Sequence, residues 1–206
     1  MQVFVTVLNE SPRVDWRTAR RDAARATILA AAWDLVRTEG LAALSLRELA
    51  RRAGITTPTV YSYFDSKNAI FDAMFGEGAR AFAAIAVQPF ESDDPRERLL
   101  ACTKRFVDFC ISDVPRYQLL FQHSVPGFSP SAESFEPAIR ALDVVREQLA
   151  LNGVHDERHV DLWTALTTGL VDQQISNDPG GERWSRLVDG ATEMFLAHCA
   201  TERTAT

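Results

Sequence analysis

Apolar residues recur every three or four positions along most of the chain, which is the spacing of amphipathic helices. The first such stretch begins after Asp15, a residue type favoured at a helix N-cap, and stops at Gly40, a type favoured just beyond a helix. It predicts one long helix. Residues 1–14 begin with alternating apolar positions that find no partner strand downstream, so we expect a mobile arm there.

Two short helices separated by a tight turn are predicted next. Ser45 and Glu48 have the spacing of a capping box, in which the serine accepts a bond from the backbone and the glutamate reaches back. Gly54 ends this helix and supplies the backbone freedom that a tight turn needs. Thr56 or Thr57 can then cap the third helix.

The third helix should end near Phe64, and the rest of the chain continues the helical pattern. Six further helices are predicted, over about residues 67–87, 95–112, 114–122, 134–151, 156–176 and 182–199. The Pro-, Ser- and Gly-rich stretch 124–131 is the one long loop, and no pair of strands is evident. We therefore predict an all-α fold of about nine helices.

Charge is distributed unevenly along the chain. The net charge is −6, but residues 1–67 carry ten Lys and Arg against seven Asp and Glu, a net +3, and the remainder carries a net −9. A basic amino-terminal part joined to an acidic remainder is expected if one end of the protein meets a polyanion. Scatter of surface charge is the alternative.

Composition favours a folded protein that stays in the cytoplasm. The chain has 206 residues, of which 46% are hydrophobic and 24% charged, enough to bury a substantial core. No apolar stretch approaches the roughly 18 residues of a membrane span, and the start of the chain lacks the basic residues of a signal peptide. Cys102, Cys110 and Cys199 include no CxxC pair, so we expect reduced core residues.

The first three predicted helices have the lengths and the tight turn of a helix-turn-helix, in which the third helix enters the major groove of DNA. Two segments carry a closer likeness: ILAAAWDLVRTEG at 28–40 and SLRELARRAGITTPTVYSYFDSK at 45–67. Together they strongly resemble the DNA-binding domain of the tetracycline-repressor (TetR) family. The rest of the chain resembles that family in helix count and order alone.

The resemblance implies three parts: an arm over residues 1–14, a helix-turn-helix DNA-binding domain over 15–67, and a ligand-binding and dimerisation domain over 68–206. It also implies a homodimer whose carboxy-terminal helices pair in a four-helix bundle, with a ligand cavity in each larger domain. The function expected from it is a transcriptional repressor that binds a pseudo-palindromic operator in double-stranded DNA. A small, largely apolar effector would release it.

Matching the family's motif places a set of residues at the duplex: Ser45, Arg47, Thr56, Thr57, Pro58, Thr59, Tyr61, Tyr63 and Lys67. Tyr61 offers a phenol donor for a phosphate, and Arg47 can reach a phosphate or a guanine edge. Lys67 lies in the first turn of a helix, where a cation opposes the macrodipole, so a nearby phosphate would explain it. Half-buried packing is the alternative for the two tyrosines. Three arginines are expected to be solvated, with contact to the DNA backbone or minor groove as the alternative for one of them: Arg20, Arg21 and Arg25.

A set rich in aromatic residues in the larger part of the chain is the candidate lining of a ligand cavity, with core packing as the alternative. It comprises Phe106, Phe109, Cys110, Tyr117, Phe121, His123, Phe128, Trp163 and Thr167. His123 stands at the end of a predicted helix, where it could bond a ligand or cap the helix.

The last two helices carry apolar stripes that exceed what one small domain needs, so part of each stripe is expected to meet a second copy. The candidates are Val160, Trp163, Leu170, Val171, Trp184, Leu187, Val188, Ala191 and Phe195.

The sequence contains no glycine-rich phosphate loop, no GxSxG elbow and no HExxH motif, so we expect no enzyme. His155 and His159 have the i, i+4 spacing of a metal site but lack a third ligand, and we expect no metal or cofactor. Two alternatives stay open: a regulator that activates or answers no small molecule, and an all-α ligand-sequestering or protein-interaction module without DNA binding. Salt-dependent binding to duplex DNA would separate them.

Overall fold

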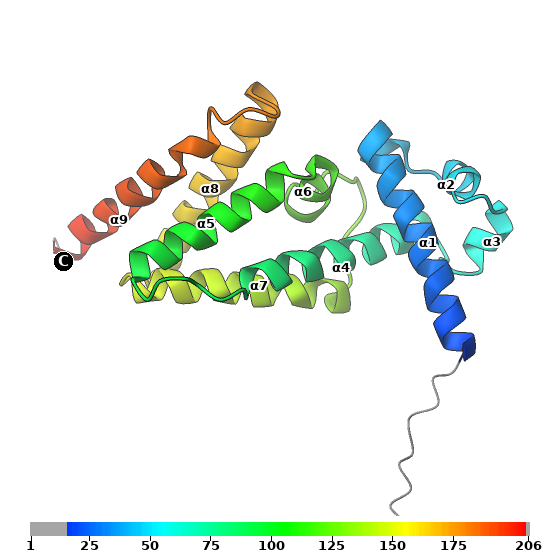
Figure 1. The fold of residues 1–206 in the computed structure, drawn as a ribbon, viewed down its shortest axis with the longest axis horizontal. Helices are drawn as coiled ribbons and strands as arrows, with labels where there is room; N and C mark the ends of the chain where they lie inside the picture. The colour runs from blue at the N-terminus through cyan, green and yellow to red at the C-terminus, as the bar shows by residue number, and fades with distance from the viewer. Residues whose placement is uncertain (1–15, 205–206) are drawn as a thin grey trace, which may run out of the picture.

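The structure is a computed structural model that describes residues 16–204. Within this range the chain forms nine α-helices and two short 3-10 segments, and no strand. Three helices gather at one end of an elongated molecule, the remainder form a longer bundle, and the last helix lies at the opposite end (Figure 1). The predicted all-α fold is confirmed, whereas the arm over residues 1–14 and the cap at Asp15 lie outside the described residues.

The amino-terminal domain consists of α1 (Trp16–Glu39), a 3-10 segment (Leu41–Ala43), α2 (Leu46–Arg52) and α3 (Thr57–Tyr61). α1 ends at Gly40, whose φ of 84° lies in a region that residues with a side chain rarely adopt. The inner faces of the helices meet in a core in which Leu35, Leu49 and Val60 are inaccessible to solvent. This core holds α2 and α3 in a fixed relation across the turn.

Side-chain caps begin both short helices, as predicted. Ser45 Oγ accepts a hydrogen bond from the backbone N–H of Glu48 at 3.2 Å. Thr56 is the cap of α3, since its Oγ1 accepts from the backbone N–H of Thr59 at 3.3 Å. The capping box is not reciprocal, because the Glu48 carboxylate accepts instead from Arg51 Nε at 2.9 Å. That hydrogen bond lowers the pKa of Glu48.

The third helix ends three residues before the predicted end at Phe64. The backbone N–H of Tyr63 bonds the carbonyl of Val60 at 3.0 Å, so the chain tightens into a turn there. A serine cap follows at once, with Ser66 Oγ accepting from the N–H of Ala69 at 3.1 Å. The turn therefore delivers the chain directly into the next helix.

The larger domain consists of α4 (Lys67–Ala86), α5 (Pro95–Ile111), α6 (Val114–Phe121), α7 (Ala132–Leu151), α8 (Glu157–Asn177), a 3-10 segment (Ser185–Leu187) and α9 (Val188–Thr204). α4 leaves the amino-terminal domain and lies along α7, while α8 and α9 pack at the far end (Figure 1). No helix of the described range is long and apolar enough to cross a membrane.

The last helix begins at Val188, six residues later than predicted. The buried side chain of Gln174 explains the delay, because its Oε1 accepts from the backbone N–H groups of Trp184 and Ser185 at 2.8 and 3.1 Å. Those bonds hold the preceding segment in a 3-10 turn. The three cysteines are buried, as predicted, and burial raises the pKa of Cys102 to about 11.

Candidate DNA-binding surface and ligand cavity

The outer surface of α2 and α3 presents several of the residues predicted at the duplex. Arg47 is exposed on α2, Pro58 is exposed in the first turn of α3, and Tyr61 is 51% exposed at its end. None of these three side chains belongs to the core beneath them. These side chains can therefore contact a ligand without disturbing the core of the domain.

The three threonines at the start of α3 are not equivalent. Thr56 Oγ1 caps the helix and also lies 2.8 Å from Thr59 Oγ1, so both hydroxyls already have local partners. Among the described residues no hydrogen bond involves the Thr57 hydroxyl, which is half-buried in the first turn. Thr57 is therefore the threonine of this group that keeps its hydroxyl for a ligand.

Two predicted contacts have local packing roles. Lys67 Nζ lies 5.4 Å from the centre of the Phe71 ring, so a contact within the chain favours this cation and a phosphate is not needed to explain it. Tyr63 is half-buried, and its carbonyl accepts a bond from Arg25. The Arg25 guanidinium also lies 4.2 Å from the Phe64 ring, so it fastens α1 to the turn after α3.

A basic and aromatic surface at the start of α1 adjoins this turn. Trp16 is 64% exposed, and Arg17, Arg20 and Arg21 are exposed beside it. These four residues line a shallow hollow together with Ser62 and Tyr63. Trp16 is not among the residues predicted from the sequence, although a tryptophan close to three arginines is a signal that the sequence carries.

A second residue that the sequence analysis missed is Arg52, which holds α2 against α1. Its Nη1 donates to Asp34 at 2.6 Å, its Nη2 donates to Glu39, and its Nε lies 3.5 Å from Glu48. The guanidinium is largely shielded from solvent. It therefore braces the domain beneath the surface where Arg47 is exposed.

The larger domain encloses a cavity of about 320 Å³ between helices α4 to α8. Five of the predicted residues line it: Phe106, Phe121, His123, Trp163 and Thr167. The lining also includes residues that the sequence analysis did not single out, among them Phe82, Phe135, Leu142 and Thr168. His123 is the one ionisable side chain of the lining besides the thiol of Cys102, so the cavity is largely apolar.

The other four predicted ligand residues do not line this cavity: Phe109, Cys110, Tyr117 and Phe128. Phe109 is buried between the Phe82 ring, 5.0 Å away, and the Arg116 guanidinium, 3.9 Å away. The Tyr117 hydroxyl donates to Asp172 at 2.7 Å. Cys110 is inaccessible to solvent, and Phe128 packs on Phe71 and Phe75. Core packing, the alternative reading, is correct for these four.

His123 follows the last turn of α6 with a φ of 46°, the single positive value at a residue other than glycine in the described range. Such a conformation ends a helix, and strained residues of this kind gather at binding sites. Its side chain also borders the cavity. The position of His123 is therefore compatible with both roles predicted for it, ending the helix and bonding a ligand.

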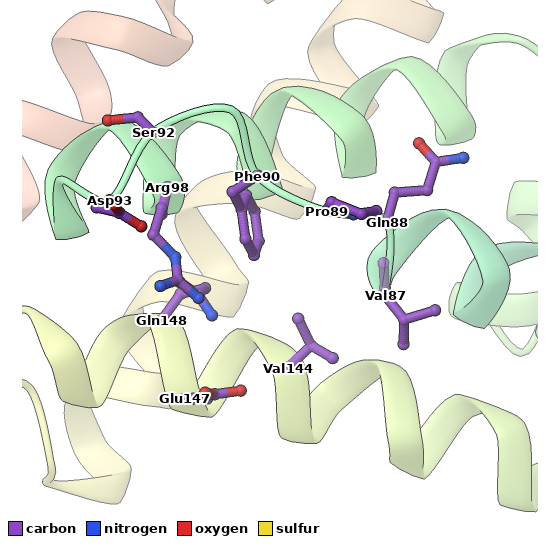
Figure 2. A pocket seen from close by; sticks show the side chains of 11 residues that line it. Val87, Gln88, Pro89, Phe90, Ser92, Asp93, Arg98, Val144, Glu147 and Gln148 are labelled. Atoms are coloured by element: carbon purple, nitrogen blue, oxygen red, sulfur yellow. The ribbon is translucent and has the colours of Figure 1, made fainter.

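A second hollow of about 410 Å³ lies between the α4–α5 connection and α7 (Figure 2). Its lining is charged: Arg98 reaches from α5 toward Glu147 and Gln148 of α7, and Asp93 stands nearby (Figure 2). Phe90 is held by Arg98 at 4.8 Å. This hollow contrasts with the apolar cavity and belongs to no predicted set.

Most of the predicted dimer stripe is buried within the chain itself. Val160, Trp163, Val171, Val188 and Phe195 are all less than 9% exposed, which corrects their assignment to an interface. Leu170, Trp184 and Ala191 are half-buried. Leu187, in the 3-10 segment, is the one exposed residue of the stripe, and the exposed large apolar residues of α8 and α9 are Leu162 and Met194, at 44% and 61%.

Two connections join the amino-terminal domain to the cavity. α4 begins at Lys67 and carries Phe82, part of the cavity wall, near its other end. Arg37 at the end of α1 donates to Asp113 through Nε and Nη2 at 3.0 and 2.7 Å. Asp113 also caps α6, the helix that carries Phe121.

Comparison with known proteins agrees with this geometry. Residues 28–74 match the family model for bacterial regulatory proteins of the tetR family. The helix-turn-helix domain of this chain is therefore of the TetR type. The match begins in α1 and ends inside α4, so it covers the helix-turn-helix and the helix that leaves it.

Two named relatives are transcriptional regulators. The transcriptional activator FasR of Mycolicibacterium smegmatis is 31% identical over 104 residues, 50% of this chain and 48% of FasR. The regulator EthR of Mycobacterium tuberculosis is 37% identical over 83 residues, 37% of this chain and 38% of EthR. The chain thus spans about half or less of the curated relatives it matches.

The fold similarity extends further than the sequence similarity. A tetR-family transcriptional regulator from Streptomyces coelicolor superposes with a TM-score of 0.70 at 21% identity, covering 90% of this chain and 84% of that one. At this identity the comparison shows the fold alone. The larger domain therefore has the same fold as the corresponding part of that structure.

Proposed function

We propose that this protein is a DNA-binding transcriptional regulator whose helix-turn-helix enters the major groove. The observation that carries the proposal is a surface group of three exposed residues, Arg47, Pro58 and Tyr61, and the half-buried Thr57, over the core of a domain that matches the TetR family. Arg47 and Tyr61 serve phosphates, whereas Thr57 and Pro58 face base edges. Trp16, Arg17 and the arginines beside them extend the contact to the flanking backbone.

The regulator acts as a homodimer on a pseudo-palindromic operator. Exposed large apolar residues on α8, α9 and the 3-10 segment between them support this, because Leu162, Leu187 and Met194 gain little by facing water. Leu162, Leu166, Met194, Phe195 and, at one end, His198 border a groove of about 290 Å³ between the two helices. A second copy covers this groove, and the two recognition helices then meet successive turns of the duplex.

A small, largely apolar effector occupies the 320 Å³ cavity. Aromatic and aliphatic side chains line most of it, so a charged ligand would lose its hydration without gaining a partner. The His123 ring and the hydroxyls of four lining threonines are the polar side chains that can orient the effector: Thr103, Thr164, Thr167 and Thr168. The charged hollow around Arg98 does not suit such a molecule.

Effector binding releases the DNA by moving α4 and α6, which wall the cavity and also contact the amino-terminal domain. Release requires only that the effector binds more tightly to a conformation whose two recognition helices do not fit successive major grooves than to the conformation that binds DNA. We propose repression as the sign of regulation. Activation is the second candidate, because the relative FasR bears the name of an activator.

Selection of bound sequences from random duplex DNA by the purified protein tests the proposal. A preferred pseudo-palindrome should emerge, and its affinity should fall steeply as salt rises, because phosphate contacts release counterions. Inserting half a helical turn between the half-sites should weaken binding more than any single base change. Absence of salt-dependent duplex binding would favour the ligand-sequestering or interaction module.

A further inference from the structure

The outer groove between α8 and α9 ends in a cluster of metal-ligating side chains. His159 lies in the first turn of α8, and His198 and Glu202 lie one turn apart near the end of α9. One donor atom from each of the three residues lies within 4.8 Å of the others. His159 Nε2 is 3.0 Å from one Glu202 oxygen, and His198 Nε2 is 3.7 Å from the other.

We propose that His159, His198 and Glu202 bind a divalent transition-metal ion of the zinc type. Two imidazoles and one carboxylate are a ligand set that zinc uses, with the fourth position left to water. Ligand atoms about 2.0–2.1 Å from a tetrahedral zinc lie about 3.3 Å from one another. Side-chain rotations of His198, 48% exposed, suffice to bring the present separations to that value.

The helices hold the cluster before any metal arrives. His198 and Glu202 are at i and i+4 on α9, so both side chains leave the same face of the helix. His159 is only 13% exposed, and its ring stands 6.0 Å from the His198 ring at 76°. Ordering these ligands on binding therefore costs little conformational freedom.

A positively charged side chain lies beside the cluster. Arg158 Nη2 lies 4.0 Å from the Glu202 carboxylate, and the Arg158 side chain is 78% exposed. A long exposed side chain can swing into solvent, so this weak ion pair does not close the site. The sequence suggested a different pair, His155 with His159, but His155 precedes the helix and lies outside the cluster.

The test is calorimetric titration of the untagged full chain with zinc chloride alone at pH 7.5. We expect one zinc ion per chain, whereas magnesium chloride should not bind, because magnesium prefers oxygen ligands. His198→Ala and Glu202→Gln should each weaken zinc binding by about tenfold or more, which is about 1.4 kcal/mol. His155→Ala is the matched control and should bind zinc as the original chain does.

Three outcomes would overturn the site. The first is that the chain binds no zinc at concentrations up to about 100 µM, which corresponds to weak binding. The second is that it binds magnesium as tightly as zinc, and the third is that His155→Ala and His198→Ala lower the zinc affinity equally. Thermal melting gives a second readout, since zinc should raise the Tm of the original chain and of His155→Ala but not of His198→Ala. A zinc-dependent shift that survives in both His198→Ala and Glu202→Gln would equally refute the assignment. These measurements do not depend on DNA, so they can fail while the proposed function stands.

Discussion

The amino-terminal domain and the larger domain place their candidate functional residues in opposite ways. In the first, Arg47, Thr57 and Tyr61 lie outside a small closed core, and short side-chain caps fix the helices beneath them. In the second, the candidates line an internal wall and are the same residue types as the core. Recognition and stability are therefore separable in the amino-terminal domain, whereas in the larger domain one aromatic residue can serve either purpose.

The largest expected effect is on stability, and it tests which aromatic residues of the larger domain serve the core and which serve the cavity. Phe109→Ala should lower the free energy of unfolding by about 3–5 kcal/mol, because the ring is buried between Phe82 and Arg116. Phe121→Ala removes a half-buried cavity residue, so it should cost less stability and change the effector response. Denaturant unfolding and effector titration measure the two quantities. Equal stability losses for both variants, with an unchanged response, would assign Phe121 to the core as well.

The next effect concerns the far end of the molecule. Met194→Glu should weaken dimerisation about 100-fold, or about 2.8 kcal/mol, because it puts a charge into the apolar face where we propose that a second copy binds. Sedimentation at micromolar concentration should then report a monomer. Ile139→Glu is the matched control, since Ile139 is an exposed apolar residue on α7. A dimer that tolerates Met194→Glu but not Ile139→Glu would place the interface on α7.

A smaller effect is expected at the DNA surface, where function should separate from stability. Lys67→Ala should weaken binding to operator and to random duplex alike by about tenfold, and make the salt dependence shallower by about one unit per half-site. The lost contact with Phe71 should cost the fold only about 0.5–1 kcal/mol.

Tyr61→Phe is the comparison for Lys67→Ala, because it removes a neutral donor. It should lower operator affinity and leave the salt slope unchanged. Filter-binding or anisotropy titrations across a salt series give both numbers. If Lys67→Ala lowers thermal stability while leaving the affinity and the slope intact, the residue serves packing alone.

The smallest effect tests the link between the two regions. Arg37→Ala breaks the ion pair between Arg37 and Asp113. Because the Arg37 side chain is half exposed, the change should lower the coupling free energy between the effector cavity and the DNA surface by about 0.5–1 kcal/mol. The effector concentration for half-release should shift a few-fold, while operator affinity without effector stays nearly constant. Arg140→Ala breaks a matched exposed pair with Glu136 inside α7 and should leave the coupling unchanged. Equal shifts in both variants would remove the pair from the route between the domains.

The amino-terminal domain was largely predictable from the sequence, for a local reason. Its helices start at Ser45 and Thr56 and turn at Gly54, and each of these signals acts through a backbone group within four residues. The helical spacing of apolar residues likewise determined the all-α fold and most helix bounds. The resemblance to the TetR family was also carried by this part of the chain, residues 28–67.

Only the tertiary structure decided which apolar residues are core, cavity or exposed face. Phe109 and Phe121 have the same chemistry and lie within twelve positions, yet one is packed under Arg116 and the other borders a cavity. The cluster of His159 with His198 and Glu202 joins residues about forty positions apart. Burial and ligand geometry depend on how distant helices pack, whereas periodicity records only that a helix has an apolar side.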